Sequence, residues 1–295
     1  MADEEAPRRN EGYQDLRDLL ERFEEMGEIA HVDGADWNLE VGAISEMTAA
    51  EKPGRAKAML FDNIKGYPEG TRILAGGANA FKRLAVVLGL PEPKNEIDLV
   101  KSYRERSKRE FKLIPPVEVS TGPVMENIMR DDEVDVWKFP APFVHELDGG
   151  RYIGTDDAVI MRDPDTGWVN SATYRVMVHD EKTVGIWMSP GKQGRLISEK
   201  YFAKGEPCPV LISCGHDPLL FLVSHQEIDH EVDEFAFAGG MRGRALEVIP
   251  SEIHGLPIPA HAEIVLEGEI YGDELREEGP FGEFMGDYAS TSSQL

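Results

Sequence analysis

Two glutamates enclose a short segment late in the sequence, Glu278-Gly-Pro-Phe-Gly-Glu283. Two glycines and a proline around one aromatic residue predict a tight turn whose shape is set by the backbone. Such a turn suits a proton donor at one end and, at the other, a second acid that orients an arginine. The alternative is a solvated acidic turn, which is the reading we expect for the adjoining Glu277 and Asp287.

An arginine that could pair with these acids ends the segment Asn170-Ser-Ala-Thr-Tyr-Arg175. If the segment is one strand, alternation places Ser171, Thr173 and Arg175 on one face. Asn170 starts the strand, where the backbone can turn its side chain toward the same cavity. An inward arginine requires a carboxylate partner or an anionic ligand. The alternative is a surface strand with an outward arginine.

Two further segments could bind ions. The stretch Trp187-Met-Ser-Pro-Gly-Lys-Gln-Gly-Arg195 can cradle a phosphate with its backbone N–H groups, and Lys192 adds charge. Glu234 enters an apolar stretch, where it either caps an element or holds a hard cation. His216, His225 and His230 lack the spacing of a zinc site, so no dedicated zinc site is expected.

The composition limits the classes of partner. The chain has 295 residues and a formal net charge of −24, which argues against a nucleic-acid partner. No apolar run is long enough to span a bilayer, and the acidic start is unlike a secretory signal. We therefore expect a cytoplasmic protein without a membrane segment. The only cysteines, Cys208 and Cys214, are expected to be reduced and buried.

The pattern of apolar residues divides the chain near Pro116. Residues 1–12 are predicted to be disordered. Helical spacing, short apolar runs and turn residues predict a small α+β domain over residues 13–115. Its helices are expected at about 16–26, 39–50, 80–88 and 98–112, and its strands at 29–32, 58–61 and 73–75.

Short β-rich segments separated by turns continue over residues 116–295. They predict a split β-barrel rather than a doubly wound sheet, so the fold class is α+β. No G-x-G-x-x-G pattern supports a dinucleotide fold. The expected strands lie at 117–119, 158–161, 172–178, 184–188, 210–213, 219–223, 246–249 and 262–270.

Taken together, these segments resemble the UbiD family of prenylated-FMN-dependent decarboxylases, and the match runs through nearly the whole chain. The segment Glu278-Gly-Pro-Phe-Gly-Glu-Phe284 is highly specific. Ala58-Met-Leu-Phe-Asp-Asn-Ile-Lys-Gly-Tyr67 and Ala260-His-Ala-Glu-Ile-Val-Leu-Glu-Gly268 support it. The resemblance implies that Arg175 binds the substrate carboxylate, that Glu278 holds Arg175, and that Glu283 protonates the carbon that loses CO₂.

The resemblance also implies a bound cofactor, prenylated FMN, which serves as the electron sink. A divalent ion, Mn²⁺ or Mg²⁺, and a monovalent ion, K⁺ or Na⁺, would link its phosphate to the protein. Asn170 and Glu234 match two of the metal ligands, and Gln193 stands where the family has a histidine. The implied cofactor contacts are Asn170, Ser171, Thr173, Tyr174, Arg175, Trp187, Met188, Ser189, Lys192, Gln193, Ser224 and Glu234.

Gln193 offers an amide oxygen, a weaker ligand for Mn²⁺ than an imidazole. Family members usually continue into a C-terminal domain that completes the active site and forms the dimer. We therefore expect either a homo-oligomer or a complex with a subunit that supplies this domain.

The expected function is a reversible, non-oxidative decarboxylation of an aromatic or α,β-unsaturated carboxylic acid that releases CO₂. A flavin prenyltransferase would supply the cofactor. One alternative is an incomplete or non-catalytic flavin-binding subunit that needs a partner chain. A flavin reductase is more remote, because it has no need for the paired glutamates.

Overall fold

The first part of the chain builds a small α+β unit. The computed structural model describes residues 13–51, 54–108, 112–283, 286–289 and 292–294, so the predicted disorder of residues 1–12 lies outside the described residues. Strand β1 (Ile29–Asp33) pairs in parallel with β2 (Ala58–Asp62), and β2 pairs antiparallel with β3 (Ile73–Ala75). The helices of this unit are α1 (Leu16–Glu25), α2 (Glu40–Glu51), α3 (Phe81–Val87) and α4 (Glu96–Lys108).

Helix α1 shows how the sequence sets these boundaries. The Asp15 carboxylate accepts a hydrogen bond from the backbone N–H of Asp18, which caps the helix at its first turn. Leu19 and Phe23 lie four residues apart and are fully buried. Gly27 follows the helix with φ of +68°, a left-handed conformation that favours glycine and ends the element.

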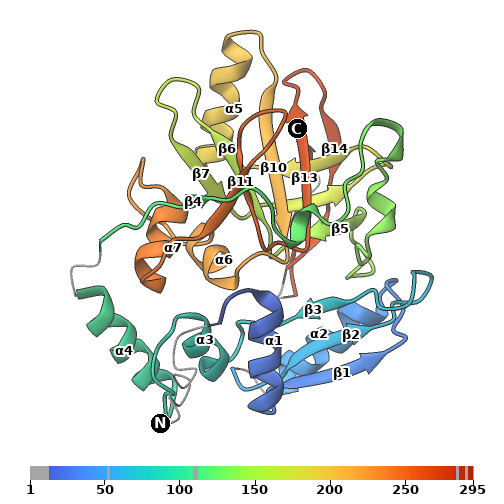
Figure 1. Ribbon diagram of the computed structural model, residues 1–295. Helices are drawn as coiled ribbons and strands as arrows, with labels where there is room; N and C mark the ends of the chain where they lie inside the picture. Colours follow the sequence, from blue (N-terminus) through green and yellow to red (C-terminus); the bar gives the residue numbers. More distant parts are fainter. Residues whose placement is uncertain (1–12, 52–53, 109–111, 284–285, 290–291, 295) are drawn as a thin grey trace, which may run out of the picture.

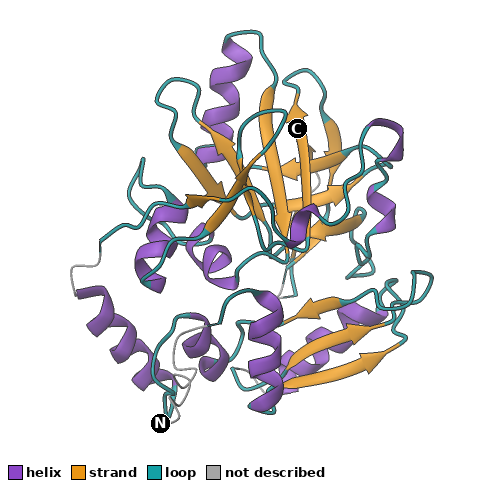
Figure 2. Cartoon of the chain, in the orientation of Figure 1, coloured by secondary structure: helices purple, strands orange, loops and turns teal. Residues whose placement is uncertain are grey.

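The second part of the chain is richer in strands, which form several small sheets (Figure 1). Figure 2 shows them together above the N-terminal unit, with short helices around them. The largest sheet has the order β13-β10-β6-β7, and the others are β5-β8-β9, β12-β11-β4, β14-β17 and β15-β16. The strands are β4 (Val117–Glu118), β5 (Arg151–Gly154), β6 (Ala158–Arg162), β7 (Val169–Ala172), β8 (Arg175–Val178), β9 (Val184–Trp187), β10 (Cys208–Cys214), β11 (Glu247–Pro250), β12 (Pro257–Pro259), β13 (Ile264–Ile270), β14 (Arg276–Glu278), β15 (Phe281–Gly282), β16 (Tyr288–Ala289) and β17 (Ser292–Gln294).

Helical segments accompany these strands. The described residues of this part form the α-helices α5 (Gln193–Ala203), α6 (Pro218–Ser224) and α7 (Glu234–Arg242). The segments Pro123–Met125, Asp131–Glu133 and Val136–Lys138 are single 3-10 turns. The predicted α+β class is confirmed. The described strands do not close into one barrel, so the split barrel stays a prediction.

The strand predicted at 172–178 is wrong in one respect that matters for the site. It is interrupted, and β7 and β8 belong to different sheets. At the break, the Thr173 hydroxyl donates to the Asp157 carbonyl at 3.0 Å, and the Tyr174 N–H donates to the Asp157 carboxyl at 3.3 Å. Because the Thr173 hydroxyl and the Tyr174 N–H bond to Asp157, the segment leaves the first sheet at this point, and Arg175 begins a strand of another sheet.

The strand predicted at 219–223 is also wrong, because this segment is helix α6. Asp217 accepts a hydrogen bond from the N–H of Leu219 at 3.0 Å, and Pro218 occupies the first helical position. Leu219, Leu220 and Val223 are buried, at positions that lie on one face of a helix. In so short an apolar run, periodicity alone does not separate a helix from a strand.

One apolar core joins the two parts of the chain. It contains Leu19 and Phe23 of α1, Leu60 of β2, Leu219 of α6 and Phe235 of α7. Burial of apolar surface stabilises by about 25 cal/mol per Å², so a shared core favours a fixed arrangement of the parts. A second core lies between β6, β8, β9, β10 and α5.

Two smaller predictions can be compared with the fold. Cys208 and Cys214 are free, as predicted; Cys208 is buried and Cys214 partly buried. None of the described helices combines the length and the apolar character needed to cross a membrane.

Candidate active site

The structure brings Arg175 and Glu278 together in a buried ion pair. Arg175 opens β8, and Glu278 ends β14. The Nε and Nη2 groups of Arg175 donate to the two carboxylate oxygens of Glu278 at 2.8 and 2.6 Å. The Glu278 side chain is fully buried, and that of Arg175 is 9% exposed. A two-point bond of this kind fixes the plane of the guanidinium as well as its position.

Two aromatic rings lie close to the guanidinium of Arg175. Arg175 faces Trp187 across the β8–β9 ladder, and its guanidinium carbon lies 4.9 Å from the centre of the Trp187 ring. The same carbon lies 5.0 Å from the centre of the Phe281 ring. Rings at these distances favour the cation and exclude water from its faces.

Tyr152 is a third partner that sequence reasoning missed. Its hydroxyl donates to Glu278 Oε1 at 2.8 Å, and its ring packs edge-on against Phe281 at 4.7 Å. Burial, together with the Glu278 carboxylate, raises the pKa of Tyr152, which therefore stays a neutral donor. Tyr152 precedes Glu278 by 126 residues, and no local pattern marks it as a partner.

Glu283 lies beside the pair but is not part of it. Its Oε1 atom is 4.0 Å from Arg175 Nη1, and its side chain is 54% exposed. The Glu283 N–H donates to the carbonyl of Asp287 at 2.8 Å, and the N–H of Gly282 donates to the buried Asp148 carboxylate at 2.8 Å. The backbone around Glu283 is thus fixed while its carboxylate remains accessible.

A second polar group lies at β7, where Asn170 and Glu234 meet. Asn170 Nδ2 donates to Glu234 Oε1 at 3.2 Å, and the N–H of Ser171 donates to Glu234 Oε2 at 3.0 Å. Burial raises the pKa of Glu234 to about 7. Asn170 Oδ1 is buried and has no hydrogen-bond partner among the described residues. An unpaired amide oxygen beside a buried carboxylate is a donor set suited to a hard divalent cation.

Glu234 therefore does not cap α7, which was one of the two sequence-based alternatives. The cap is Asp233, whose carboxylate accepts from the N–H groups of Phe235 and Ala236 at 2.8 and 3.2 Å. Glu234 is the first residue of the helix and is buried against β7. Among the described residues, no cluster of three histidine, cysteine or acidic side chains could hold a metal.

Gln193 and Lys192 lie where α5 begins. The N–H of Gly194 donates to the Tyr174 hydroxyl at 3.0 Å, which brings this end of the helix to the break between β7 and β8. Lys192 is exposed, and Met188 is buried beneath the loop. Within the described ranges, no hydrogen bond joins Gln193 to Asn170 or Glu234.

Hydroxyl groups complete the surroundings of β7. Ser171 and Ser224 share a hydrogen bond of 2.8 Å between their hydroxyl oxygens. The N–H of Thr173 donates to the carbonyl of Ser224 at 3.3 Å. In the loop before α5, the backbone carbonyl of Ser189 accepts from the N–H of Lys192 at 3.2 Å. The predicted site residues thus form two groups, one at Arg175 and one at Asn170, joined by the interrupted segment.

The close approach at Gly149 gives a test of how tightly the acidic turn is held. The N–H of Gly149 donates to the Pro280 carbonyl at 2.7 Å, and a Cβ atom at Gly149 would lie 2.0 Å from the Gly279 carbonyl oxygen. Gly149→Ala should lower the free energy of unfolding by about 1–3 kcal/mol, measured in urea. Gly268→Ala, where nothing lies within 4 Å, should change it little. Equal stabilities of the two variants would contradict this packing.

Comparison with known proteins identifies the family. The model of the 3-octaprenyl-4-hydroxybenzoate carboxy-lyase Rift-related domain, UbiD, matches residues 116–295. The model of the corresponding N-terminal domain matches residues 20–102. The chain belongs to the UbiD family.

Several of its relatives within the UbiD family are named as decarboxylases. A pyrrole-2-carboxylic acid decarboxylase of Pseudomonas aeruginosa is 34% identical over 285 residues, which cover 94% of this chain and 56% of that protein. Ferulic acid decarboxylase 1 of Candida dubliniensis is 33% identical, with 92% and 55% covered. The chain therefore spans a little over half the length of these UbiD relatives.

Solved UbiD structures share the fold. Vanillic acid decarboxylase of Sedimentibacter hydroxybenzoicus in its closed form superposes with a TM-score of 0.88 at 28% identity, covering 96% of this chain and 60% of that one. The UbiD-class enzyme HmfF of Pelotomaculum thermopropionicum, in an evolved dimeric form with prFMN, gives 0.84 at 28% identity, with 95% and 63% covered.

Proposed function

We propose that the protein containing this chain catalyses the reversible, non-oxidative decarboxylation of an aromatic or α,β-unsaturated carboxylic acid with prenylated FMN. The observation that carries the proposal is the buried Arg175–Glu278 pair, with Glu283 4.0 Å from the guanidinium. The named UbiD decarboxylases support it.

The three side chains divide the work. Two of the three guanidinium nitrogens of Arg175 are occupied by Glu278, and the third, Nη1, faces Glu283. Nη1 is therefore the atom that can bind a substrate carboxylate, while the pair keeps the guanidinium in one orientation. The partly exposed Glu283 can deliver a proton to the carbon and then recover one from solvent. The reaction balances as R–CO₂⁻ plus H⁺ giving R–H plus CO₂.

The cofactor, when bound, supplies an electron sink for the carbon that loses CO₂. We assign its contacts to the residues around β7, β8, β9 and the start of α5, with Mn²⁺ or Mg²⁺ held by Asn170, Gln193 and Glu234 and K⁺ or Na⁺ close by. The unpaired Oδ1 of Asn170 is the main support for the cation. The assigned contacts are Asn170, Ser171, Thr173, Tyr174, Arg175, Trp187, Met188, Ser189, Lys192, Gln193, Ser224 and Glu234.

Gln193→His should tighten metal binding. An imidazole nitrogen is a better ligand for Mn²⁺ than an amide oxygen, so we expect Mn²⁺ affinity to rise by about tenfold. Titration of the protein with Mn²⁺, followed by electron paramagnetic resonance, measures the change. Lys204→His, at an exposed position just after the far end of α5, is the control and should leave the affinity unchanged. An unaltered affinity in Gln193→His would remove Gln193 from the ligand set.

Production of the protein together with a flavin prenyltransferase tests the function itself. We expect bound flavin in the absorbance spectrum and CO₂ release from a panel of cinnamic, hydroxybenzoic and heteroaromatic acids. Bound flavin without CO₂ release would indicate a non-catalytic flavin-binding subunit. If no flavin is bound, either by this chain alone or by the chain together with a co-purified partner, the proposed enzymatic function would be contradicted.

The proposal also covers the oligomeric state of the protein, its location in the cell and the domain that surrounds the flavin. The structure of vanillic acid decarboxylase (ShVdcCD) of Sedimentibacter hydroxybenzoicus in its open form includes truncated ShVdcD beside the chain that matches this one. We propose that the present protein likewise works as a homo-oligomer or in a complex, in the cytoplasm, with residues 116–295 forming a split-barrel domain around the flavin.

A further inference from the structure

Helices α6 and α7 form an antiparallel pair that is fastened at both ends. At one end, the last residue of α6, Ser224, and the first residue of α7, Glu234, both bond to Ser171. At the other end, Asp217, the cap of α6, accepts from Nη2 of Arg242, the last residue of α7, at 2.7 Å. The first end carries proposed cofactor and metal residues, and the second end carries none of them.

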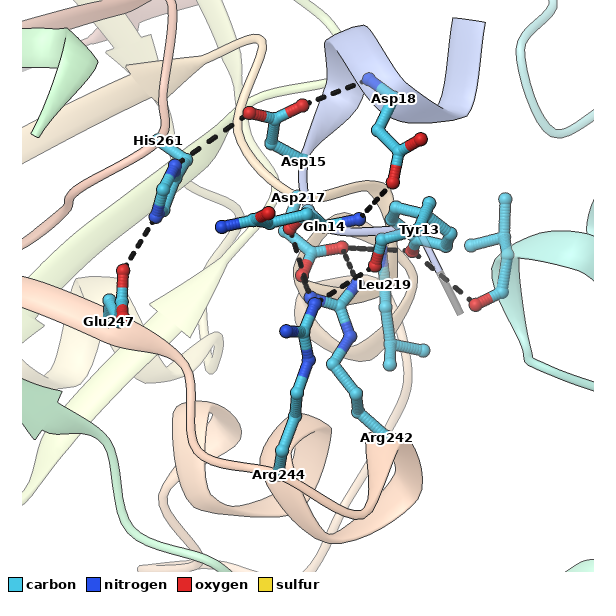
Figure 3. Close-up of polar contacts among 11 residues, drawn as sticks. Tyr13, Gln14, Asp15, Asp18, Asp217, Leu219, Arg242, Arg244, Glu247 and His261 are labelled. Carbon is cyan, nitrogen blue, oxygen red and sulfur yellow. Dashed lines mark hydrogen bonds and ion pairs between the residues drawn. The ribbon is translucent and has the colours of Figure 1, made fainter. Parts of the chain in front are cut away.

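The second end is a compact buried group, which we call the helix clamp: Tyr13, Asp217 and Arg242 (Figure 3). The Tyr13 hydroxyl donates to Asp217 Oδ1 at 2.9 Å. The Arg242 guanidinium also pairs with the other Asp217 oxygen and lies 4.6 Å from the centre of the Tyr13 ring. Tyr13 is 2% exposed, and the side chains of Arg242 and Asp217 are 9% and 11% exposed.

The clamp also ties the helix pair to the N-terminal unit. Tyr13 precedes α1, its hydroxyl lies 3.4 Å from the carbonyl of Val87, and its own carbonyl accepts from Arg244 at 3.0 Å. Asp217 has a double role, because it caps α6 through the N–H of Leu219. Loss of Arg242 would leave a buried carboxylate without its cation, and the capped end of α6 would move to reach water.

A short helix transmits such a movement along its axis. Helix α6 has seven residues and is therefore about 10 Å long, with its backbone groups bonded internally. Ser224 and Glu234 meet Ser171 through single hydrogen bonds, which follow any shift of the helices that carry them. Residues that orient metal ligands from outside their contact sphere typically change metal affinity by about 10–100-fold when replaced.

We propose that Tyr13, Asp217 and Arg242 are positioning residues that set, through α6 and α7, where Ser224 and Glu234 meet β7. They thereby tune the affinity of the cofactor site for its divalent cation. The claim about cation affinity rests on the proposed function, whereas the claim that the clamp places the two helix ends does not.

Arg242→Met tests the clamp with two measurements on the same sample. The first is hydrogen–deuterium exchange of the amides of Ser171 and Thr173, which donate to Glu234 and Ser224 and need no metal. The second is Mn²⁺ affinity by electron paramagnetic resonance. We expect exchange at both amides to be faster and Mn²⁺ affinity to be lower, each by about tenfold or more. Arg242→Lys keeps the positive charge and should therefore restore part of the slow amide exchange and part of the Mn²⁺ affinity.

Arg83→Met is the matched control. Arg83 is fully buried and donates to Glu28 Oε2 at 3.0 Å, so this variant also loses a buried arginine–carboxylate pair, but in the N-terminal unit. Arg83→Met should be less stable than the unsubstituted protein. The exchange rates of the Ser171 and Thr173 amides and the Mn²⁺ affinity should stay within about twofold of its values. If amide exchange depended only on overall stability, it would instead become faster in both Arg242→Met and Arg83→Met.

Three outcomes decide the inference. Wild-type exchange at both amides in folded Arg242→Met would overturn it, as would equal acceleration in Arg83→Met. If Arg242→Met does not fold, Tyr13→Phe is the second variant, because it removes only one hydroxyl group. It should speed the exchange of the two amides several-fold. Unchanged exchange in Tyr13→Phe would then overturn the inference. If the unsubstituted protein binds no Mn²⁺, the metal site fails, and the amides alone still decide whether the clamp places the helix ends.

Discussion

Replacing Glu283 with glutamine is expected to lower the rate of CO₂ release by about a hundredfold or more. Glutamine keeps the shape of the side chain but has no acidic proton to deliver to the carbon. The side chain is 54% exposed and makes no hydrogen bond to the described part of the chain, so stability and flavin content should be retained. Steady-state rates with the best acid of the panel, together with the flavin absorbance, measure both properties.

Glu277→Gln is the control for this experiment. Glu277 is exposed, lies in β14 next to Glu278, and loses the same charge on substitution. Its rate should stay close to that of the unsubstituted protein. Full activity in Glu283→Gln would assign proton delivery to another group.

Arg175→Met should have the largest effect on stability and should abolish turnover. Removing Arg175 leaves the fully buried Glu278 carboxylate with Tyr152 as its side-chain partner within the described ranges. Breaking a buried pair in this way costs about 3–5 kcal/mol. The substrate carboxylate also loses the cation that would bind it. Urea unfolding gives the free energy of unfolding, and CO₂ release gives the activity.

Arg195→Met provides a contrast on the surface. Arg195 donates to Glu199 at 2.9 Å, four residues along α5, with side-chain exposures of 32% and 53%. Exposed helical pairs contribute about 0.3–0.5 kcal/mol, so this variant should unfold at nearly the same urea concentration as the unsubstituted protein. Similar losses in the two variants would show that the Arg175–Glu278 pair is not the buried, desolvated contact described above.

The sequence alone predicts those parts of the site that are local or motif-like. The glutamates of the 278–283 turn are five residues apart, and the glycines between them indicate a fixed backbone. An inward arginine needs a carboxylate partner, which predicts that Arg175 pairs with an acid, and the family resemblance implies that this acid is Glu278. The grouping of Asn170 with Glu234 came from family resemblance, and the structure brings these two residues within hydrogen-bond distance.

Contacts between distant residues could not be predicted in this way. Tyr152 reaches Glu278, and Asp157 interrupts the strand before Arg175, only because the sheets bring them there. Helix α6 was misassigned because its apolar run is shorter than the length over which helical and strand periodicities diverge. The signal for it was the Asp217-Pro218 pair, a helix start that outweighed β propensity. The clamp between Tyr13 and Asp217 joins residues 204 positions apart and left no pattern in the sequence.

Decarboxylation in D₂O tests the central claim most directly. The protein, produced with a flavin prenyltransferase, would be incubated with an accepted acid, and the product would be examined by mass spectrometry and NMR. We predict one deuterium on the carbon that carried the carboxylate, one CO₂ for each product molecule, and no oxygen added to that carbon. An oxygenated product, or product formed at the same rate by Glu283→Gln, would contradict a non-oxidative reaction in which Glu283 delivers the proton.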